Sequence, residues 1–209
     1  LANSGTAFEV PFLKRLKDLS DEVCPVVKDR RTGAEYPVLA ALVDHKLKEL
    51  DYKLAVSHEV EFIGYNHPGG KRTYLRSLCF VLQNAVRRIY PDKVLIINHS
   101  LPSGLYCTIC EKEPLEDGRR AVHELDDKAL AELKGEMRSI VSADLPFTKV
   151  KMEAAAAEEL FLANGQPDKA ALLKSLGMLI CSVYYLDGQA DTFHGPLLPS
   201  TGYLKVFDL

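Results

Sequence analysis

The chain has 209 residues, 47% of them hydrophobic and 26% charged, enough to build a hydrophobic core in one large or two small domains. Its formal net charge of -3 argues against a generally cationic nucleic-acid binder, although a local basic strip is compatible with it. The five cysteines show no dense spacing pattern, which favours reduced thiols over a disulfide scaffold. No apolar run has the length of a membrane span and the first residues do not form a signal peptide, so we expect a cytoplasmic chain without a membrane partner.

The first part of the chain, residues 1–65, has the pattern of a small α+β unit. A strand is predicted over residues 7–10, followed by a helix over residues 11–23 whose apolar side chains recur at helical spacing. Residues 36–43 and 60–63 are rich in β-branched and aromatic side chains, which predicts two further strands. A segment rich in Gly and Pro then separates this unit from the rest of the chain.

The second part, residues 66–209, opens with the strongest helix signal in the sequence. A single apolar stripe extends over residues 73–90. Residues 94–97 and 105–110 are predicted to pair as a β-hairpin across a turn at residues 102–104.

The remaining predicted elements of this second α+β part are three helices followed by two strands. An amphipathic helix is predicted over residues 126–142, with one of the two aspartates at its start as the cap. Further helices are predicted over residues 152–164 and 170–176, and a strand over residues 179–186. The tail, residues 191–209, is predicted to end in another strand.

The segment from Gly64 to Thr73 has some features of a phosphate-binding loop. Its first glycine lies one residue too far from Lys71, and Arg72 stands where such a loop needs Ser or Thr. We therefore interpret the segment as a turn between domains that precedes a helix, and the chain as not itself a P-loop kinase.

Cys107 and Cys110 have the spacing of half a zinc site. The sequence offers no second pair of ligands, and on a strand the two thiols would point to opposite faces. We therefore expect no metal here, because free cysteine usually behaves as a small buried apolar residue.

Two histidines lie where functional loops are common. His99 follows a predicted strand, and His194 lies between Phe193 and a Gly-Pro pair, although both positions also suit an ordinary surface or capping histidine. Ser100 and Ser103 lack the nucleophile-elbow pattern of serine hydrolases.

The order of five segments resembles the N-terminal half of threonyl-tRNA synthetases over nearly the whole chain. These segments are residues 76–91, 97–106, 144–147, 157–165 and 191–199. The resemblance implies a TGS domain of β-grasp type, followed by an α+β domain like the editing domains of threonyl- and alanyl-tRNA synthetases.

In that family, the editing domain removes wrongly attached serine from tRNA. Its signature is H-x-x-x-H on the long helix and C-x-x-x-H near the end of the domain. The resemblance places Arg76 and Phe80 at the first pair, and Phe193 and Leu197 at the second. It implies that the catalytic set has been replaced, because Phe and Leu can neither coordinate a metal nor transfer a proton.

Other features of the editing pocket are retained. Lys169 and Asp191 match positions that line it, Gly104 matches the glycine of the hairpin, and Cys107 stands at a position where the family has tyrosine. The resemblance thus implies a cleft that is retained but lacks its catalytic side chains. Its candidate ligand-binding residues are Arg76, His99, Cys107, Lys169, Asp191 and His194.

Residues 99–107 and 193–203 are also similar to uridine-kinase-like proteins, which carry this pair of domains ahead of a P-loop nucleoside kinase domain. This similarity implies an N-terminal accessory piece of such a protein, with the kinase domain as its partner in cis. ATP and Mg²⁺ would belong to that kinase domain, and we expect no cofactor in the 209 residues of this chain.

Three functions agree with these patterns. The first is a non-catalytic regulatory module that binds a small anionic or nucleotide-like ligand. The second is a module that binds RNA or tRNA. The third is a residual deacylase that uses His99, His194 or Cys107 as base or nucleophile.

Overall fold

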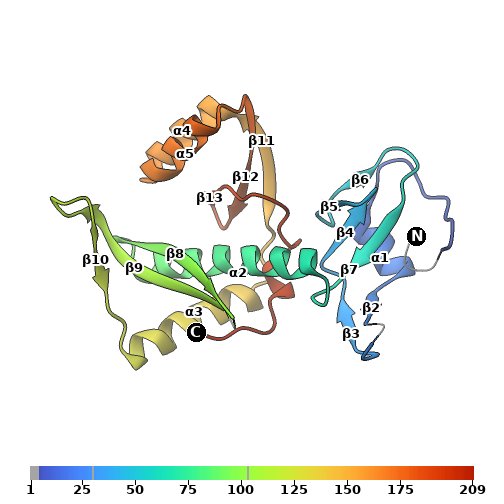
Figure 1. Ribbon diagram of the computed structural model, residues 1–209, viewed down its shortest axis with the longest axis horizontal. Helices are drawn as coiled ribbons and strands as arrows, with labels where there is room; N and C mark the ends of the chain where they lie inside the picture. Colours follow the sequence, from blue (N-terminus) through green and yellow to red (C-terminus); the bar gives the residue numbers. More distant parts are fainter. Residues whose placement is uncertain (1–4, 30, 103) are drawn as a thin grey trace.

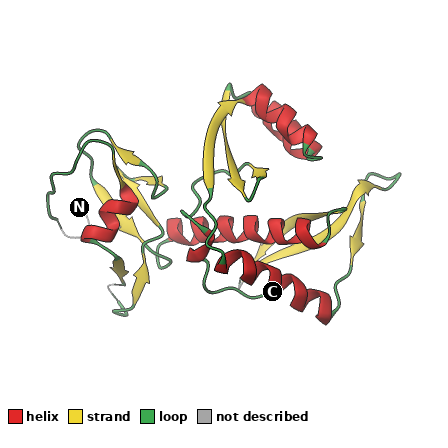
Figure 2. Cartoon of the chain, turned by 180° about the vertical axis from the view of Figure 1, so that it is seen from behind, coloured by secondary structure: helices red, strands yellow, loops and turns green. Residues whose placement is uncertain are grey.

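The computed structural model describes residues 5–29, 31–102 and 104–209, whose side chains form three hydrophobic cores (Figure 1). One core belongs to an N-terminal unit, which lies beside the first turns of the long helix α2 (Pro68–Ile89). The second lies between α2, the helix α3 (Asp127–Ser142) and a three-stranded sheet. The third belongs to a lobe of two helices and three strands that projects away from both, as the reverse view also shows (Figure 2).

The N-terminal unit consists of one helix and short antiparallel strands. Its core is built around Leu16 and Leu19 of the helix and Phe62 of the last strand. The sheets have the orders β1-β6, β2-β3 and β5-β4-β7. The elements are β1 (Lys14–Arg15), α1 (Leu16–Val23), β2 (Val26–Lys28), β3 (Glu35–Pro37), β4 (Ala40–Val43), β5 (Lys46–Lys48), β6 (Lys53–Leu54) and β7 (Val60–Ile63).

Three predictions in this unit were wrong at the level of single elements. Residues 7–10 form no strand, and no described strand pairs with them. The helix begins at Leu16 instead of Pro11, because Leu13 has a φ of 61°, which is incompatible with a right-handed helix. The single strand predicted over residues 36–43 is two strands in different sheets, since Pro37 has no N–H to donate to a continuous ladder.

The second core surrounds α2 (Pro68–Ile89), which begins five residues earlier than predicted. His67 caps this helix, accepting a hydrogen bond from the Gly69 N–H, and Pro68 occupies the first helical position, where its missing N–H does no harm. A side chain at Gly70 would meet the Gly64 carbonyl oxygen at 1.9 Å. The two glycines that suggested a turn therefore permit close packing at the helix start.

A long hairpin and α3 complete this part of the molecule. The hairpin consists of β8 (Lys93–Leu101) and β9 (Gly104–Pro114), which pair antiparallel from Leu101 opposite Gly104, and β10 (Arg120–His123) extends the sheet. This confirms the predicted hairpin, although Ser103 of its turn lies outside the described residues. The Asp126 carboxylate caps α3 (Asp127–Ser142) by accepting from the Ala129 N–H at 2.7 Å, so this prediction is also confirmed.

The lobe packs α4 (Ala154–Ala163) and α5 (Pro167–Leu176) against β11 (Thr148–Glu153), β12 (Ile180–Leu186) and β13 (Gln189–Asp191). The prediction missed β11, which pairs with β12 along its whole length and delays the start of α4 to Ala154. The strand predicted at the end of the chain is also wrong. The tail contains the 3-10 turn η1 (Thr201–Tyr203), and no strand follows it in the described tail.

The fold is therefore α+β, with antiparallel pairing in every described sheet. The division into residues 1–65 and 66–209, and their assignment as a TGS domain and an editing-type domain, remain predictions. No helix among the described residues is both long and apolar enough to cross a bilayer.

Candidate functional site

The four positions assigned to the lost catalytic set meet in space. Arg76 and Phe80 lie one turn apart on α2, and Phe193 and Leu197 belong to the segment that follows β13. The Phe80 and Phe193 ring centroids are 5.1 Å apart, and Phe80 and Leu197 are 0% and 1% exposed in the same core. The candidate site thus lies in the protein interior, between α2 and the segment after β13 that contains Phe193 and Leu197, which is called the returning segment below.

Aromatic side chains fill the candidate site. The Phe80 ring stacks on Phe147 with a centroid distance of 5.9 Å, and Tyr184 meets Phe193 edge-on at 6.0 Å. Packing of this kind stabilises a core but offers no lone pair to a metal or to a reacting proton. No group of three or more His, Cys, Asp or Glu in the described residues is placed to hold a metal ion.

Arg76 anchors the returning segment at the edge of the aromatic cluster. Its Nη1 donates to the Pro196 carbonyl oxygen at 2.9 Å. A Cβ on Gly195 would approach the guanidinium to 2.8 Å, and the φ of 126° at this position itself favours glycine. Burial lowers the pKa of Arg76, with a smaller contribution from Arg72, but a guanidinium stays charged in proteins. Arg76 is a fixed cation that holds backbone in place.

Lys169 and Asp191 form an ion pair between α5 and β13. Asp191 is 2% exposed, and its Oδ1 also accepts from the Thr192 N–H at 2.6 Å. Burial lowers the pKa of Lys169 even though Asp191 opposes that shift. Arg87 interacts with the same carboxylate and lies three turns beyond Arg76 on α2, roughly 16 Å along the helix axis. The pair is therefore separate from Arg76.

The other three candidate residues do not share one place. His194 is exposed beside the Arg76 anchor, whereas His99 is exposed on β8 with its ring 5.2 Å from that of Tyr106. Cys107 on β9 faces the opposite side of α2, where it lines a cavity of about 690 Å³ together with Cys79. The six candidates therefore lie in pairs or singly. Within the part of the chain that the structure describes, they do not line a common cleft.

Sequence reasoning missed a link between the N-terminal unit and the lobe. The Tyr184 hydroxyl donates to Glu49 Oε2 at 3.0 Å, and Lys149 Nζ lies 2.9 Å from Glu49 Oε1. Lys149 also lies over the Tyr184 ring, 5.4 Å from its centroid. Burial, followed by the Glu49 carboxylate, raises the pKa of Tyr184. Glu49 stands in a charged stretch that is typical of a solvated surface, so no sequence signal marks it.

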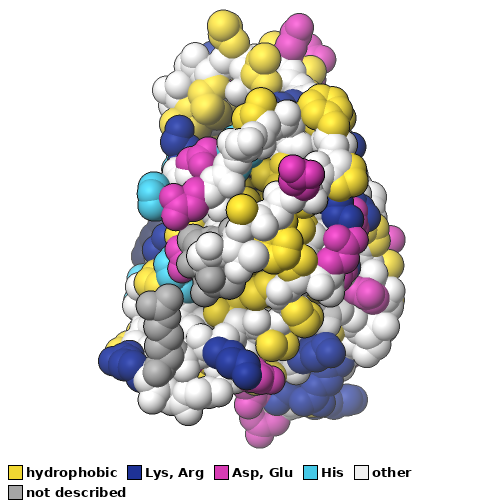
Figure 3. Space-filling model, turned by 90° about the vertical axis from the view of Figure 1, so that its right-hand side faces the viewer, with side chains coloured by type: hydrophobic (Ala, Val, Ile, Leu, Met, Phe, Trp, Pro, Cys, Tyr) yellow, Lys and Arg dark blue, Asp and Glu magenta, His cyan; other side chains and the backbone are white. Residues whose placement is uncertain are grey.

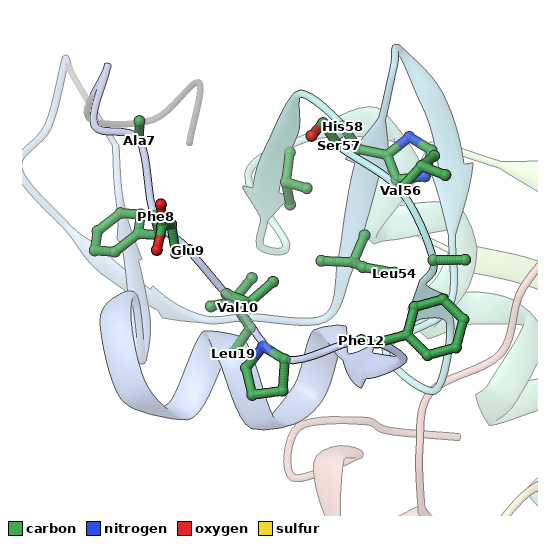
Figure 4. A pocket seen from close by; sticks show the side chains of 13 residues that line it. Ala7, Phe8, Glu9, Val10, Phe12, Leu19, Leu54, Val56, Ser57 and His58 are labelled. Carbon is green, nitrogen blue, oxygen red and sulfur yellow. The ribbon is translucent and has the colours of Figure 1, made fainter.

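Two further cavities lie outside the candidate site. One, of about 640 Å³, separates residues 7–12 from residues 54–60 in the N-terminal unit (Figure 4). The other, of about 630 Å³, lies where the N-terminal unit meets α2 and the tail. Among the candidates, only Cys107 lines any of the three cavities described for residues 5–29, 31–102 and 104–209.

Comparison with known proteins gives the family context. The chain is similar to part of threonine–tRNA ligases. It is 29% identical to the ligase of Desulforamulus reducens over 188 residues, 90% of this chain and 28% of the relative. The corresponding values are 28% over 172 residues for Carboxydothermus hydrogenoformans (82% and 26%) and 25% over 198 residues for Syntrophotalea carbinolica (93% and 30%).

The chain thus spans less than a third of the length of these relatives. No family model matches it. The similarity therefore shows that the chain resembles one region of threonine–tRNA ligases. It does not extend to the rest of those proteins.

Proposed function

We propose that this region is a non-hydrolytic counterpart of a tRNA-ligase editing region, with an accessory binding or regulatory role. The observation that carries the proposal is the contact between Phe80 and Phe193, together with buried Leu197. These side chains occupy the positions at which the resemblance places histidines and a cysteine. The pocket has become part of the core.

Hydrolysis of an aminoacyl ester needs an activated water, supplied by a metal or by a base within hydrogen-bond reach. Lys169 is engaged by Asp191, and Arg76 is engaged by backbone. His194 is exposed, and among the described residues no hydrogen bond or ion pair fixes its ring toward a reacting group. These contacts support a role in binding rather than in chemistry.

The test is release of serine from seryl-tRNA charged on a threonine tRNA. The expected rate with the chain present equals the rate of spontaneous hydrolysis. His99→Ala and His194→Ala serve as controls and are expected to leave that rate unchanged. Faster release that either substitution abolishes would establish a rebuilt deacylase and overturn the proposal.

A second candidate function is binding of tRNA or another RNA, because the similar proteins are named as tRNA ligases. The face of the N-terminal unit in Figure 3 mixes Lys and Arg with Asp and Glu, so any RNA contact would use local cations. Fluorescence anisotropy with a threonine tRNA at about 50 and about 200 mM salt tests this candidate. Binding should weaken steeply between these salt concentrations. Flat anisotropy at the lower concentration would remove the candidate.

The finer part of the proposal places a nucleoside kinase domain after this region. It rests on the sequences of residues 99–107 and 193–203, which are similar to uridine-kinase-like proteins, whereas the similar proteins reported above are ligases. The reading frame beyond Leu209 decides it. A G-x-x-x-x-G-K-[ST] segment followed by ATP-dependent phosphorylation of uridine would support the fusion, and a synthetase core would refute it.

A further inference from the structure

An aromatic cavity of about 630 Å³ lies at the junction of the N-terminal unit with α2 and the tail. This volume is within the usual range of small-molecule sites. Tyr36 and Tyr65 line it from the N-terminal side, and Tyr74 and Tyr203 line it from α2 and η1. The cavity is therefore complete only when the two parts of the chain are packed together.

The tyrosine walls are held in place by contacts within the protein. The Tyr65 and Tyr74 rings meet edge-on, with centroids 5.2 Å apart and planes at 82°. The Tyr74 hydroxyl donates to the Val206 carbonyl oxygen at 2.8 Å and accepts from the Val206 N–H at 3.0 Å. Rigid aromatic surface of this kind binds planar rings by stacking, with little loss of conformational entropy.

A second wall is fixed by Asp144. Its Oδ1 accepts from the Gly202 N–H at 3.0 Å and from Ser200 Oγ at 2.5 Å. A Cβ on Gly202 would come within 2.3 Å of the same oxygen, so a larger residue there would have to displace the Asp144 carboxylate. One oxygen of the Asp144 carboxylate is thus used to hold the wall.

Two charged side chains line the cavity, Asp144 and Lys205, and of these the Asp144 carboxylate is engaged by the hydrogen bonds given above. Lys205 is exposed and makes no ion pair or hydrogen bond with any other residue that the structure describes. Lys71 stands beside the same wall, with Nζ 5.7 Å from the Tyr65 ring centroid. An occupant that matches this surface combines a planar aromatic ring with an anionic group.

We propose that this cavity binds a single nucleotide, with its base among the tyrosines and its phosphate at Lys205. The nucleotide is either a free nucleoside monophosphate or the unpaired end of an RNA strand, which share this chemistry. A purely apolar ligand would leave Lys205 unused, and a simple anion would leave the tyrosine surface unused. The inference does not depend on the proposed loss of hydrolysis, because it concerns a different part of the molecule.

Isothermal titration calorimetry tests the proposal with four nucleoside monophosphates, inorganic phosphate and a single-stranded RNA trinucleotide. We expect saturable binding of at least one nucleotide, with Kd raised about tenfold by Lys205→Ala, which removes a charge-assisted hydrogen bond. Lys128→Ala, an exposed lysine at the start of α3, is the matched control and should leave Kd unchanged. Tyr203→Leu should weaken nucleotide binding while leaving circular dichroism and Tm near those of the parent chain.

Tighter binding of the trinucleotide than of any mononucleotide identifies an RNA end as the source, and the reverse order identifies a free nucleotide. Both orders support the site if Lys205→Ala weakens binding and Lys128→Ala does not. Absence of saturable heat with every nucleotide would overturn the proposal. So would phosphate binding as tightly as the nucleotides, or an equal effect of both lysine substitutions.

Discussion

The ring of Phe80 on α2 lies 5.1 Å, centroid to centroid, from the ring of Phe193 in the segment after β13. The resemblance to editing domains assigns a metal-binding or proton-transfer role to both positions, and the structure brings them together as a hydrocarbon contact. Since Phe80 is completely buried, this contact belongs to the largest core of the molecule. These positions contribute packing to the core, which makes stability the property to measure.

Phe80→Ala should destabilise the chain by about 3–5 kcal/mol, because it removes a buried ring and leaves a cavity between Phe147 and Phe193. Urea unfolding followed by circular dichroism measures the change. Phe12→Ala is the matched control, since Phe12 is 76% exposed, and its effect should stay within about 0.5 kcal/mol. Equal effects of the two substitutions would show that Phe80 is not a core residue.

Lys169→Met should destabilise the chain by about 2 kcal/mol, because Asp191 would keep a buried charge with Arg87 as its remaining cation. Lys174→Met, an exposed lysine on the same helix, should change stability by less than about 0.5 kcal/mol. Adding Asp191→Asn to Lys169→Met should recover part of the loss, since the amide carries no charge and still accepts from the Thr192 N–H. A double variant less stable than Lys169→Met would contradict this account.

Strong local signals predicted their elements well. The Asp126 cap and the apolar stripe after it define α3 to within a residue, because both are properties of the helix itself. The start of α2 was misplaced because Gly69 and Gly70 look like a helix breaker, and the close approach of Gly70 to Gly64 is visible only in the folded chain. The strand β11 was missed although Val150 and Met152 alternate with charged residues, which is a signal that could have found it.

The candidate site was predictable only in part, for a similar reason. The resemblance assigned Phe80 and Phe193 to the two halves of one catalytic set, and the structure places their rings in contact. The proximity of Cys107 to the other candidates could not be judged from sequence, because it depends on which face of α2 the hairpin covers. The hydrogen bond between Glu49 and Tyr184 joins segments that are far apart in the sequence. The local sequence around either residue does not predict this contact.

The stability of the chain should fall above about pH 10 partly because of Tyr184. Burial and Glu49 raise the pKa of Tyr184 in the folded state above its ordinary value of 10.0. The phenol in the unfolded chain therefore loses its proton first, so its contribution is fully present below about pH 10 and decreases as pH rises further. Urea midpoints between about pH 9 and 11 should decline less in Tyr184→Phe than in the parent chain. Parallel pH profiles would show that Tyr184 does not contribute.

Cys79 should react slowly with iodoacetamide in the folded chain although its side chain is only partly buried. Burial raises the pKa of its thiol from 9.0 to about 12, with Cys107 as a smaller cause. Because the thiolate is the reactive form, this shift lowers its fraction at pH 8 roughly a thousandfold. Peptide mass spectrometry should find Cys79 unmodified in buffer and fully modified in urea, where the ordinary pKa returns. Equal labelling rates under the two conditions would show that the cavity beside α2 admits water and stabilises the thiolate.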